Sequence, residues 1–210
     1  LNGEGLQHQD GHSHILSSTI PNCLSYDPTF SYEVAVIIKD GIQKMYVDQK
    51  NYFYYITTTN ENYEHPPMPK GSEEGIVKGM YRLIESKNPA IRLLGSGSIL
   101  NESIKAKSIL DNYGIESEIW SVTSFNLLRK DGMEVERYNQ LNPTKKEKQT
   151  YVEECFKNQS IPVIASTDYM RSYAEQIRPY IKDDFTVLGT DGFGRSDSRS
   201  SLREFFEIDA

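Results

Sequence analysis

The chain begins with a segment that cannot contribute to a hydrophobic core. Residues 1–14, LNGEGLQHQDGHSH, contain three histidines, two acidic residues and three glycines, with Leu1 and Leu6 as the apolar exceptions. Polar, glycine-rich segments form loops, and functional side chains concentrate on loops that a rigid scaffold supports. The unperturbed pKa of histidine lies near neutrality. We therefore expect any chemistry of this chain to involve its N-terminal segment.

The histidines of this segment admit three interpretations: metal ligands, solvated loop side chains, or side chains that move protons or contact a substrate. Two histidines four residues apart on a helix can share a metal ion. Gly5 and Gly11 disfavour a helix around His8 and His12, so we assign no metal ligand and favour the third interpretation. Because a free chain end has little to hold it in place, we also expect the chain to be a piece of a longer polypeptide.

Composition narrows the class of protein. The chain has 210 residues, of which 37% are hydrophobic and 25% charged, as is typical of soluble globular proteins. No apolar run approaches the roughly 18 residues that a membrane span needs. The net charge of −7 disfavours nucleic-acid binding and favours a small-molecule or protein partner. Two cysteines provide neither a disulfide framework nor a metal-binding spacing, which predicts a reducing, cytoplasmic location.

The first third of the chain predicts one helix and one strand. Asp27 and Pro28 are a good N-cap and first helical residue for a helix over 29–46. Its expected apolar face consists of Val34, Ile37, Ile38, Ile42 and Met45. Residues 52–58 are aromatic and β-branched and predict a strand, and the proline-rich segment 60–71 predicts a linker. Glu73 and Glu74 suit the first turn of a further helix, whereas 80–85 can be read as helix or strand.

From Ala90 onward, strands and helices alternate. The expected strands are 91–94, 118–122, 161–165 and 185–189. The expected helices are 99–112, 125–138, 145–158, 169–181 and 200–206. This alternation predicts an α/β fold with a mainly parallel sheet covered by helices. Ligands of such sheets bind outside the carboxyl ends of the strands.

Two glycine-rich segments follow predicted strands. Residues 95–97, Gly-Ser-Gly, sit where a phosphate cradle would, but the third glycine and the lysine of nucleotide-binding loops are missing. A tight strand-to-helix turn is the favoured interpretation. Residues 189–199, GTDGFGRSDSR, contain Arg195 and Arg199, which could grip a carboxylate or phosphate. An elaborate turn held by its own side chains explains this segment equally well.

These segments, taken in order, resemble the homodimeric bacterial pyruvate dehydrogenase family over the whole chain. The resemblance is carried by LNGEGLQHQDGHSH, IPNCLSYDPTFSYEVAVI, YYITTTNENY, LLGSGSIL, SVTSF, ASTDYMRSYAEQIRPYI and VLGTDGFGRSDSR. It implies that residues 1–70 are the C-terminal third of a thiamine pyrimidine-binding domain. Residues 71–210 would then be a transketolase-like C-terminal domain, truncated at its end.

The same resemblance implies an activity and its partners. The family decarboxylates pyruvate on thiamine diphosphate, with Mg²⁺, and reductively acetylates the lipoyl group of the dihydrolipoyl acetyltransferase component. It implies a cytoplasmic homodimer with no nucleic-acid or membrane partner. Most cofactor ligands of the family would lie outside this chain, so we assign no cofactor-binding residue and expect the chain alone to be inactive.

Residue by residue, His8 matches the histidine that the family places beside the reacting carbon. Glu4 matches an acid of the same site, and His12 and His14 belong to the same motif.

Two alternatives remain open. One is a stand-alone α/β binding module without catalysis. The other is a different thiamine enzyme such as a transketolase, against which the segments 1–8 and 191–199 argue because they look specific to pyruvate dehydrogenase.

Overall fold

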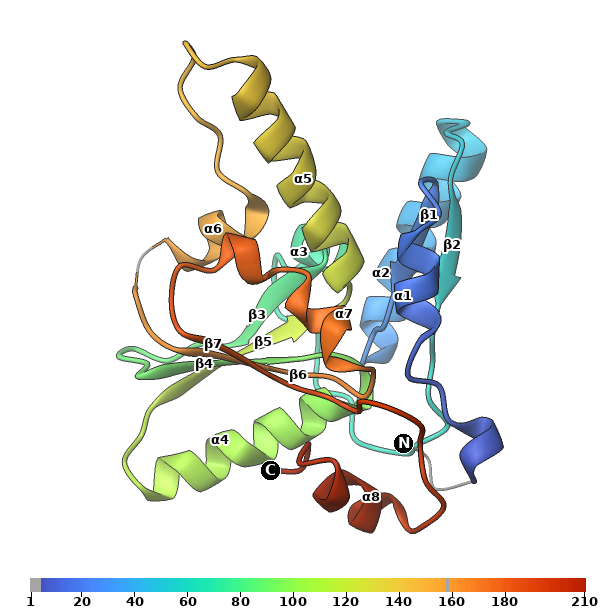
Figure 1. Cartoon of the computed structure of the whole chain (residues 1–210), viewed down its shortest axis with the longest axis vertical. Coiled ribbons are helices and arrows are strands. Elements are labelled where there is room, and N and C mark those ends of the chain that lie inside the picture. Colours follow the sequence, from blue (N-terminus) through green and yellow to red (C-terminus); the bar gives the residue numbers. More distant parts are fainter. Residues whose placement is uncertain (1–4, 158) are drawn as a thin grey trace.

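The chain folds into two sheets that lie side by side (Figure 1). The computed structural model describes residues 5–157 and 159–210. The smaller sheet pairs β1 (Cys23–Tyr26) with β2 (Phe53–Ile56) in parallel. Its other elements are a 3₁₀ turn (Leu6–His8), α1 (Ser13–Ser18), α2 (Ser31–Ile42) and a π-helical turn (Gln43–Val47). These elements form the blue and cyan lobe of Figure 1.

The larger sheet has five strands in the order β3-β5-β4-β6-β7. Its strands are β3 (Met80–Ile84), β4 (Ile91–Gly95), β5 (Ser117–Val122), β6 (Val163–Ser166) and β7 (Phe185–Leu188). Only β3, which pairs with β5, runs antiparallel to its neighbour. The predicted mainly parallel α/β sheet is therefore confirmed.

Helices cover both faces of this sheet (Figure 1). One face carries α5 (Phe125–Leu141), α6 (Tyr151–Phe156) and α7 (Arg171–Glu175), and the other carries α4 (Leu100–Asn112) and α8 (Arg199–Phe205). A short helix, α3 (Glu73–Lys78), precedes β3, and a 3₁₀ turn (Arg178–Tyr180) follows α7. Because side chains alternate along a strand, Leu94 packs in the core under α5 to α7, while Leu93 packs with Leu100 of α4.

The start and the buried face of α2 differ from the prediction. The helix begins at Ser31 with Phe30 as its N-cap, so Asp27 does not cap it. Ile37 is buried as expected, but Ile38 and Ile42 are 47% and 53% exposed. Besides Ile37, the helix buries Glu33 and Gly41, which the predicted apolar face did not include. The polar contacts of Glu33 turn this face inward, and Gly41 lets the ring of Tyr54 on β2 approach closely.

Other local expectations were also incomplete. A helix, α1, follows the N-terminal loop, and β1 begins two residues after Pro21, where the sequence indicated no strand. The undecided segment 80–85 forms strand β3, and the expected helix over 145–158 is reduced to α6. Residues 60–69 contain no helix or strand, in line with a linker. The proposed domain boundary near residue 70 stays a prediction. Within 5–157 and 159–210, no helix is long and apolar enough to cross a membrane.

A buried carboxylate joins the two sheets. Glu33 Oε2 accepts hydrogen bonds from the backbone N–H groups of Thr29 and Phe30, at 2.6 and 2.9 Å. Its Oε1 accepts from the hydroxyls of Tyr81 on β3 and Ser121 on β5, at 2.7 and 2.6 Å. Burial raises the pKa of Glu33 although these hydrogen bonds act to lower it. The first turn of α2 is thereby attached to β3 and β5, at one edge of the larger sheet.

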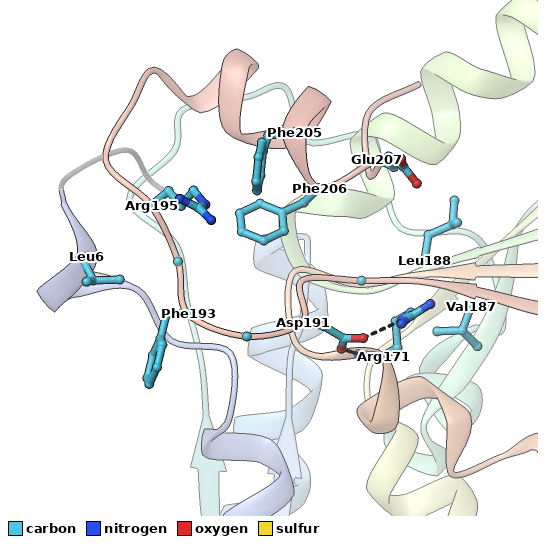
Figure 2. Close-up of a pocket in the computed structure, with 13 residues that line it drawn as sticks. Leu6, Arg171, Val187, Leu188, Asp191, Phe193, Arg195, Phe205, Phe206 and Glu207 are labelled. Atoms are coloured by element: carbon cyan, nitrogen blue, oxygen red, sulfur yellow. Dashed lines mark hydrogen bonds and ion pairs between the residues drawn. The ribbon is translucent and has the colours of Figure 1, made fainter.

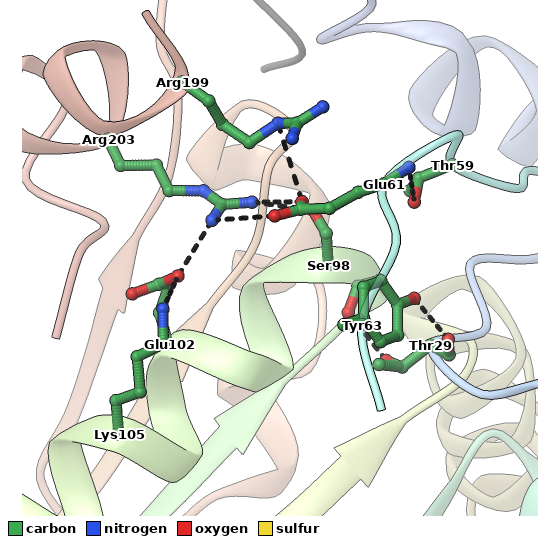
Figure 3. Close-up of polar contacts among 10 residues, drawn as sticks. Thr29, Thr59, Glu61, Tyr63, Ser98, Glu102, Lys105, Arg199 and Arg203 are labelled. Carbon is green, nitrogen blue, oxygen red and sulfur yellow. Dashed lines mark hydrogen bonds and ion pairs between the residues drawn. The ribbon is translucent and has the colours of Figure 1, made fainter. Parts of the chain in front are cut away.

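A second polar network holds the chain between the two sheets (Figure 3). The buried guanidinium of Arg203 on α8 donates to Glu61 Oε2 at 2.7 Å and to Glu102 Oε1 on α4 at 2.8 Å. Arg199 adds an ion pair to Glu61 at 3.6 Å. The segment that follows β2 is thus fixed against two helices of the larger sheet.

We expect Glu33→Ala to lower the free energy of unfolding by about 3–5 kcal/mol, because it leaves two amides and two hydroxyls in a cavity without their acceptor. Glu33→Gln should cost clearly less. Its amide oxygen can face the backbone N–H groups, while the Tyr81 and Ser121 hydroxyls rotate to accept from its NH₂. Urea denaturation measures both variants, with the exposed Glu73→Gln as a control that should stay within about 0.5 kcal/mol of the parent. Equal losses for Ala and Gln would show that the charge matters rather than the hydrogen bonds.

Candidate functional site

The strand ends of both sheets converge on one polar pocket of about 220 Å³. Asp27 directly follows β1, Thr57 directly follows β2, and Asp168 lies two residues beyond β6. The pocket is lined by His8, Gln9, Asp10, Asp27, Thr57, Thr58, Thr59, Ser98, Asp168 and Tyr169. It therefore occupies the position where α/β sheets bind ligands.

Backbone contacts at Asp27 bring the two sets of strand ends together. The Asp27 N–H donates to the carbonyl of Thr123, just beyond β5, at 2.8 Å, and the Asp27 carbonyl accepts from the Gly97 N–H at 3.1 Å. A Cβ at Gly97 would lie 2.6 Å from Asp27 Oδ2, and the φ of Gly97 is +51°. Both observations require glycine there. The Gly95-Ser96-Gly97 segment thus serves as a tight turn that makes room for the Asp27 carboxyl group.

A hydrogen-bonded chain runs from Asp27 through Thr57 to His14. Thr57 Oγ1 donates to Asp27 Oδ1 at 2.8 Å and lies 2.9 Å from His14 Nε2. Burial raises the pKa of Asp27 to about 7, the carboxylates of Asp168 and Glu33 act in the same direction, and the hydroxyls of Thr57 and Ser96 oppose it. Burial lowers the pKa of His14 to about 4, so this imidazole is neutral at pH 7 and can donate from Nε2 to Thr57.

His14 sits in an aromatic enclosure rather than on the pocket surface. Its ring is stacked on Tyr173 with centroids 4.9 Å apart and meets the edges of Tyr55 and Tyr169 at 5.4 and 4.7 Å. Among the described residues, its Nδ1 has no hydrogen-bond partner. His14 supports the wall that carries Thr57 and Tyr169, and it does not itself line the pocket.

The remaining predicted site residues are spread along the N-terminal loop. His8 is exposed and lines the pocket, whereas His12 is exposed and lies outside it. Asp10 Oδ1 accepts from the backbone N–H groups of His12 and Ser13, both at 3.0 Å, and so starts α1. Burial acts to raise the pKa of Asp10, but hydrogen bonds from Ser13 and these amides lower it. Glu4 lies outside the described residues.

The sequence analysis missed three polar residues of the pocket: Asp27, Thr57 and Asp168. Asp27 was assigned to a helix cap, and neither Thr57 nor Asp168 was singled out. The available signal was their position, since each lies just past the carboxyl end of a strand. A short strand such as β1 is hard to recognise after a proline, which hid the role of Asp27.

The glycine-rich segment 189–199 borders a second, wider cavity of about 690 Å³ (Figure 2). Asp191 Oδ2 accepts from Arg171 Nε at 2.6 Å, and its Oδ1 accepts from the Arg171 N–H at 2.9 Å. The guanidinium of Arg195 lies over the Phe205 ring, 4.7 Å from its centroid. Arg195 and Arg199 both contact partners within the chain but outside the segment, Phe205 and Glu61 respectively.

Comparisons with known proteins assign this chain to a family. The chain is 61% identical to the pyruvate dehydrogenase E1 component of Pseudomonas aeruginosa and 56% identical to that of Escherichia coli. Residues 1–66 match the model of the pyruvate dehydrogenase E1 component middle domain, and residues 79–209 match that of the transketolase-like TK C-terminal domain. The chain belongs to the pyruvate dehydrogenase E1 family. Both relatives align with 100% of this chain, which spans about 24% of their length.

Solved structures agree on the fold. Transketolase from Leishmania mexicana matches with a TM-score of 0.69 at 18% identity, over 99% of this chain and 26% of that chain. Transketolase from Campylobacter jejuni matches with a TM-score of 0.68 at 18% identity, over 99% and 28%. At this identity the likeness confirms the transketolase-like architecture of the E1 family member and carries no argument about its reaction.

The raised pKa of Asp27 predicts a pH-dependent effect of Asp27→Asn. In the folded parent the Asp27 carboxyl stays protonated up to about pH 7, whereas in the unfolded chain it ionises above about pH 3.8. Between these pH values the free energy of unfolding of the parent therefore decreases as pH rises. Asparagine cannot ionise. The stability of the variant relative to the parent should therefore increase by roughly 3–4 kcal/mol between pH 4 and pH 8. Urea denaturation across this range measures the difference, with the exposed Asp209→Asn as control. A difference that stays constant with pH would contradict the expectation.

Proposed function

We propose that this chain forms the histidine-bearing side of the active site of a pyruvate dehydrogenase E1 component. The proposed reaction is the decarboxylation of pyruvate on thiamine diphosphate, followed by reductive acetylation of the lipoyl group of the acetyltransferase component. The supporting observation is the position of His8 beside Asp10, Asp27 and Asp168 in one polar pocket, in a chain with the family's similarity over its whole length.

The pocket suits the reacting end of a substrate rather than the diphosphate of the cofactor. None of the described residues that line it is lysine or arginine. The described residues also include no group of three or more His, Cys, Asp or Glu side chains placed to hold a metal ion. We therefore propose that thiamine diphosphate and Mg²⁺ are held mostly by residues outside this chain. When bound, the cofactor supplies the nucleophilic carbon and the electron sink.

His8 is the proton-transfer residue in this proposal. It is exposed on the pocket side of a loop, and histidine is the side chain whose ordinary pKa allows proton donation and acceptance near pH 7. Its role is to hydrogen-bond the oxygen of the 2-oxo acid and to exchange a proton with it as charge develops. Because such donors act in a partly water-excluded site, they contribute several kcal/mol.

Asp27 has a complementary role in the proposal. Its pKa of about 7 keeps a fraction of the carboxyl groups protonated at neutral pH, so that it can donate a hydrogen bond into an otherwise acidic pocket. Thr57 and His14 fix its orientation through the hydrogen bonds described above. An acidic pocket that retains a proton repels the pyruvate carboxylate less than three ionised aspartates would.

The proposed location, oligomeric state and partners rest on the similarity to the same family. We propose that the complete enzyme is a cytoplasmic homodimer whose partners are pyruvate and the lipoyl domain of the acetyltransferase component. Curated relatives from Pseudomonas aeruginosa, Cupriavidus necator and Escherichia coli carry the name pyruvate dehydrogenase E1 component at 54–61% identity. This similarity favours an enzyme over the alternative of a stand-alone binding module.

In the complete enzyme, His8→Ala should lower turnover of pyruvate roughly 10²- to 10⁴-fold while the affinity for thiamine diphosphate changes little. The reason is that a proton-transfer group acts in the reaction and not in cofactor binding. Steady-state rates with the cofactor saturated measure the effect. His65→Ala is the matched control. His65 lies in the proline-rich segment, where its Nδ1 accepts from the Ser31 N–H, and it does not line the pocket.

Two results would revise the proposal. If His14→Ala lost turnover and His8→Ala did not, the aromatic enclosure of His14 and its hydrogen bond to Thr57 would carry the chemistry. If neither variant lost turnover, the N-terminal loop would be only structural. Absence of any thiamine-diphosphate-dependent release of CO₂ from pyruvate by the parent enzyme would refute the proposed reaction itself.

A further inference from the structure

The glycine-rich segment after β7 lies against the loop that carries His8. We define the GFGR loop as residues 190–196 and the His8 loop as residues 5–12. Figure 2 shows Leu6 of the His8 loop opposite Phe193 and Arg195 of the GFGR loop. We propose that the GFGR loop is a positioning element for His8, with Gly194 as its central residue. The inference rests on the proposed function of His8 and gives a role to a motif that this function did not explain.

Gly194 lies close to Gln9 of the His8 loop. A Cβ added there would lie 2.3 Å from Gln9 Cγ and 2.4 Å from Gln9 Cβ. Real side chains do not approach so closely, and Gln9 Cβ can move only if its backbone moves. The φ of Gly194 lies outside the left-handed region, so the backbone itself would accept another residue. Glycine is therefore required at this position by the presence of Gln9, the direct neighbour of His8.

Polar contacts extend this docking on both sides of His8. The Leu6 N–H donates to Ser196 Oγ at 3.3 Å, and Gln9 Nε2 donates to the Arg195 carbonyl at 3.5 Å. These hydrogen bonds are long, so the close packing of Gln9 on Gly194 determines the fit. Farther along, the Gly11 carbonyl accepts from the Met170 N–H at 3.1 Å. The His8 loop is thus placed against the larger sheet at several points.

The GFGR loop is itself held firmly. Asp191 accepts two hydrogen bonds from Arg171 at the start of α7, and the Thr190 N–H donates to the Tyr169 carbonyl at 2.9 Å. At the other end, Arg195 lies over Phe205 of α8, and Ser198 caps that helix by accepting from the Ser201 N–H. Both ends of the GFGR loop are therefore attached to helices. A side chain at Gly194 would therefore displace Gln9 and His8 rather than the GFGR loop.

The contact between the GFGR loop and the His8 loop couples these two parts of the chain at the pocket. His8 and Gln9 line the same pocket as Asp27 and Asp168, so a shift of their backbone changes the distance between the imidazole and the substrate oxygen. A misplacement of about 1 Å at a reacting group can lower a rate 10²-fold. Gly194 does not line this pocket, and in this proposal its effect on the reaction passes through the His8 loop.

The test is a set of variants in the complete enzyme. Gly194→Ala should lower kcat for pyruvate at least tenfold while the affinity for thiamine diphosphate stays at the parent value. Gln9→Gly added to Gly194→Ala removes the side-chain atoms that would clash, and kcat of this double variant should return to the value of Gln9→Gly alone. In a His8→Ala background, Gly194→Ala should cause no further loss. Gly114→Ala, which strains a φ of +71° at the end of α4 far from either loop, controls for general destabilisation and should keep the parent rate.

Hydrogen exchange separates this inference from the proposed function. Amides of residues 5–9 should exchange faster in Gly194→Ala than in the parent, whether or not His8 is catalytic. If exchange increases but His8→Ala keeps the parent rate, the docking stands and the role of His8 fails. Unchanged exchange together with unchanged kcat would overturn the inference. A loss of kcat that is equally large with and without His8 would also overturn it, because the GFGR loop would then act elsewhere.

Discussion

The arrangement of this chain depends on one buried carboxylate. Glu33 accepts two backbone N–H groups at the start of α2 and two hydroxyls from β3 and β5, so this side chain joins the smaller sheet to the larger one together with the backbone contacts of Asp27. An ionisable group that is buried without a countercharge is costly unless hydrogen bonds satisfy it. Here four donors satisfy it, and their geometry sets both where α2 begins and which face of the helix is buried.

The pocket follows from this junction. Because the segment between β1 and α2 is held by Glu33, Asp27 is presented to the turn after β4 and to Thr123 after β5. The carboxyl ends of strands from both sheets then face one small space. Burial there raises the pKa of Asp27 to about 7 and lowers that of His14 to about 4, which leaves one group able to share a proton and the other neutral. The same burial that shapes the fold therefore adjusts the protonation of the site.

The N-terminal loop shows how much can be inferred about function from a single sequence. Its density of histidine and glycine indicated a functional loop, and His8 does line the pocket. The alternating pattern after Ala90 likewise predicted each strand of the parallel part of the larger sheet. Short elements were missed, because a strand of four residues such as β1 carries too little periodicity to be recognised. The apolar face of α2 was partly wrong, since hydrogen bonding by Glu33 outweighed the hydrophobic pattern.

The sequence by itself determined the α/β class and the resemblance to the pyruvate dehydrogenase family, and it led to the proposal of a functional segment around His8, because these depend on local composition and on motifs that are read residue by residue. Only the tertiary structure decided that Asp27, Thr57 and Asp168 belong to the same pocket as His8, and that Gly194 lies against Gln9 across 185 positions of the chain. Such relations depend on which strand ends meet and on how closely two backbones approach. Both are set by long-range packing and by buried hydrogen bonds that leave no periodic trace in the sequence.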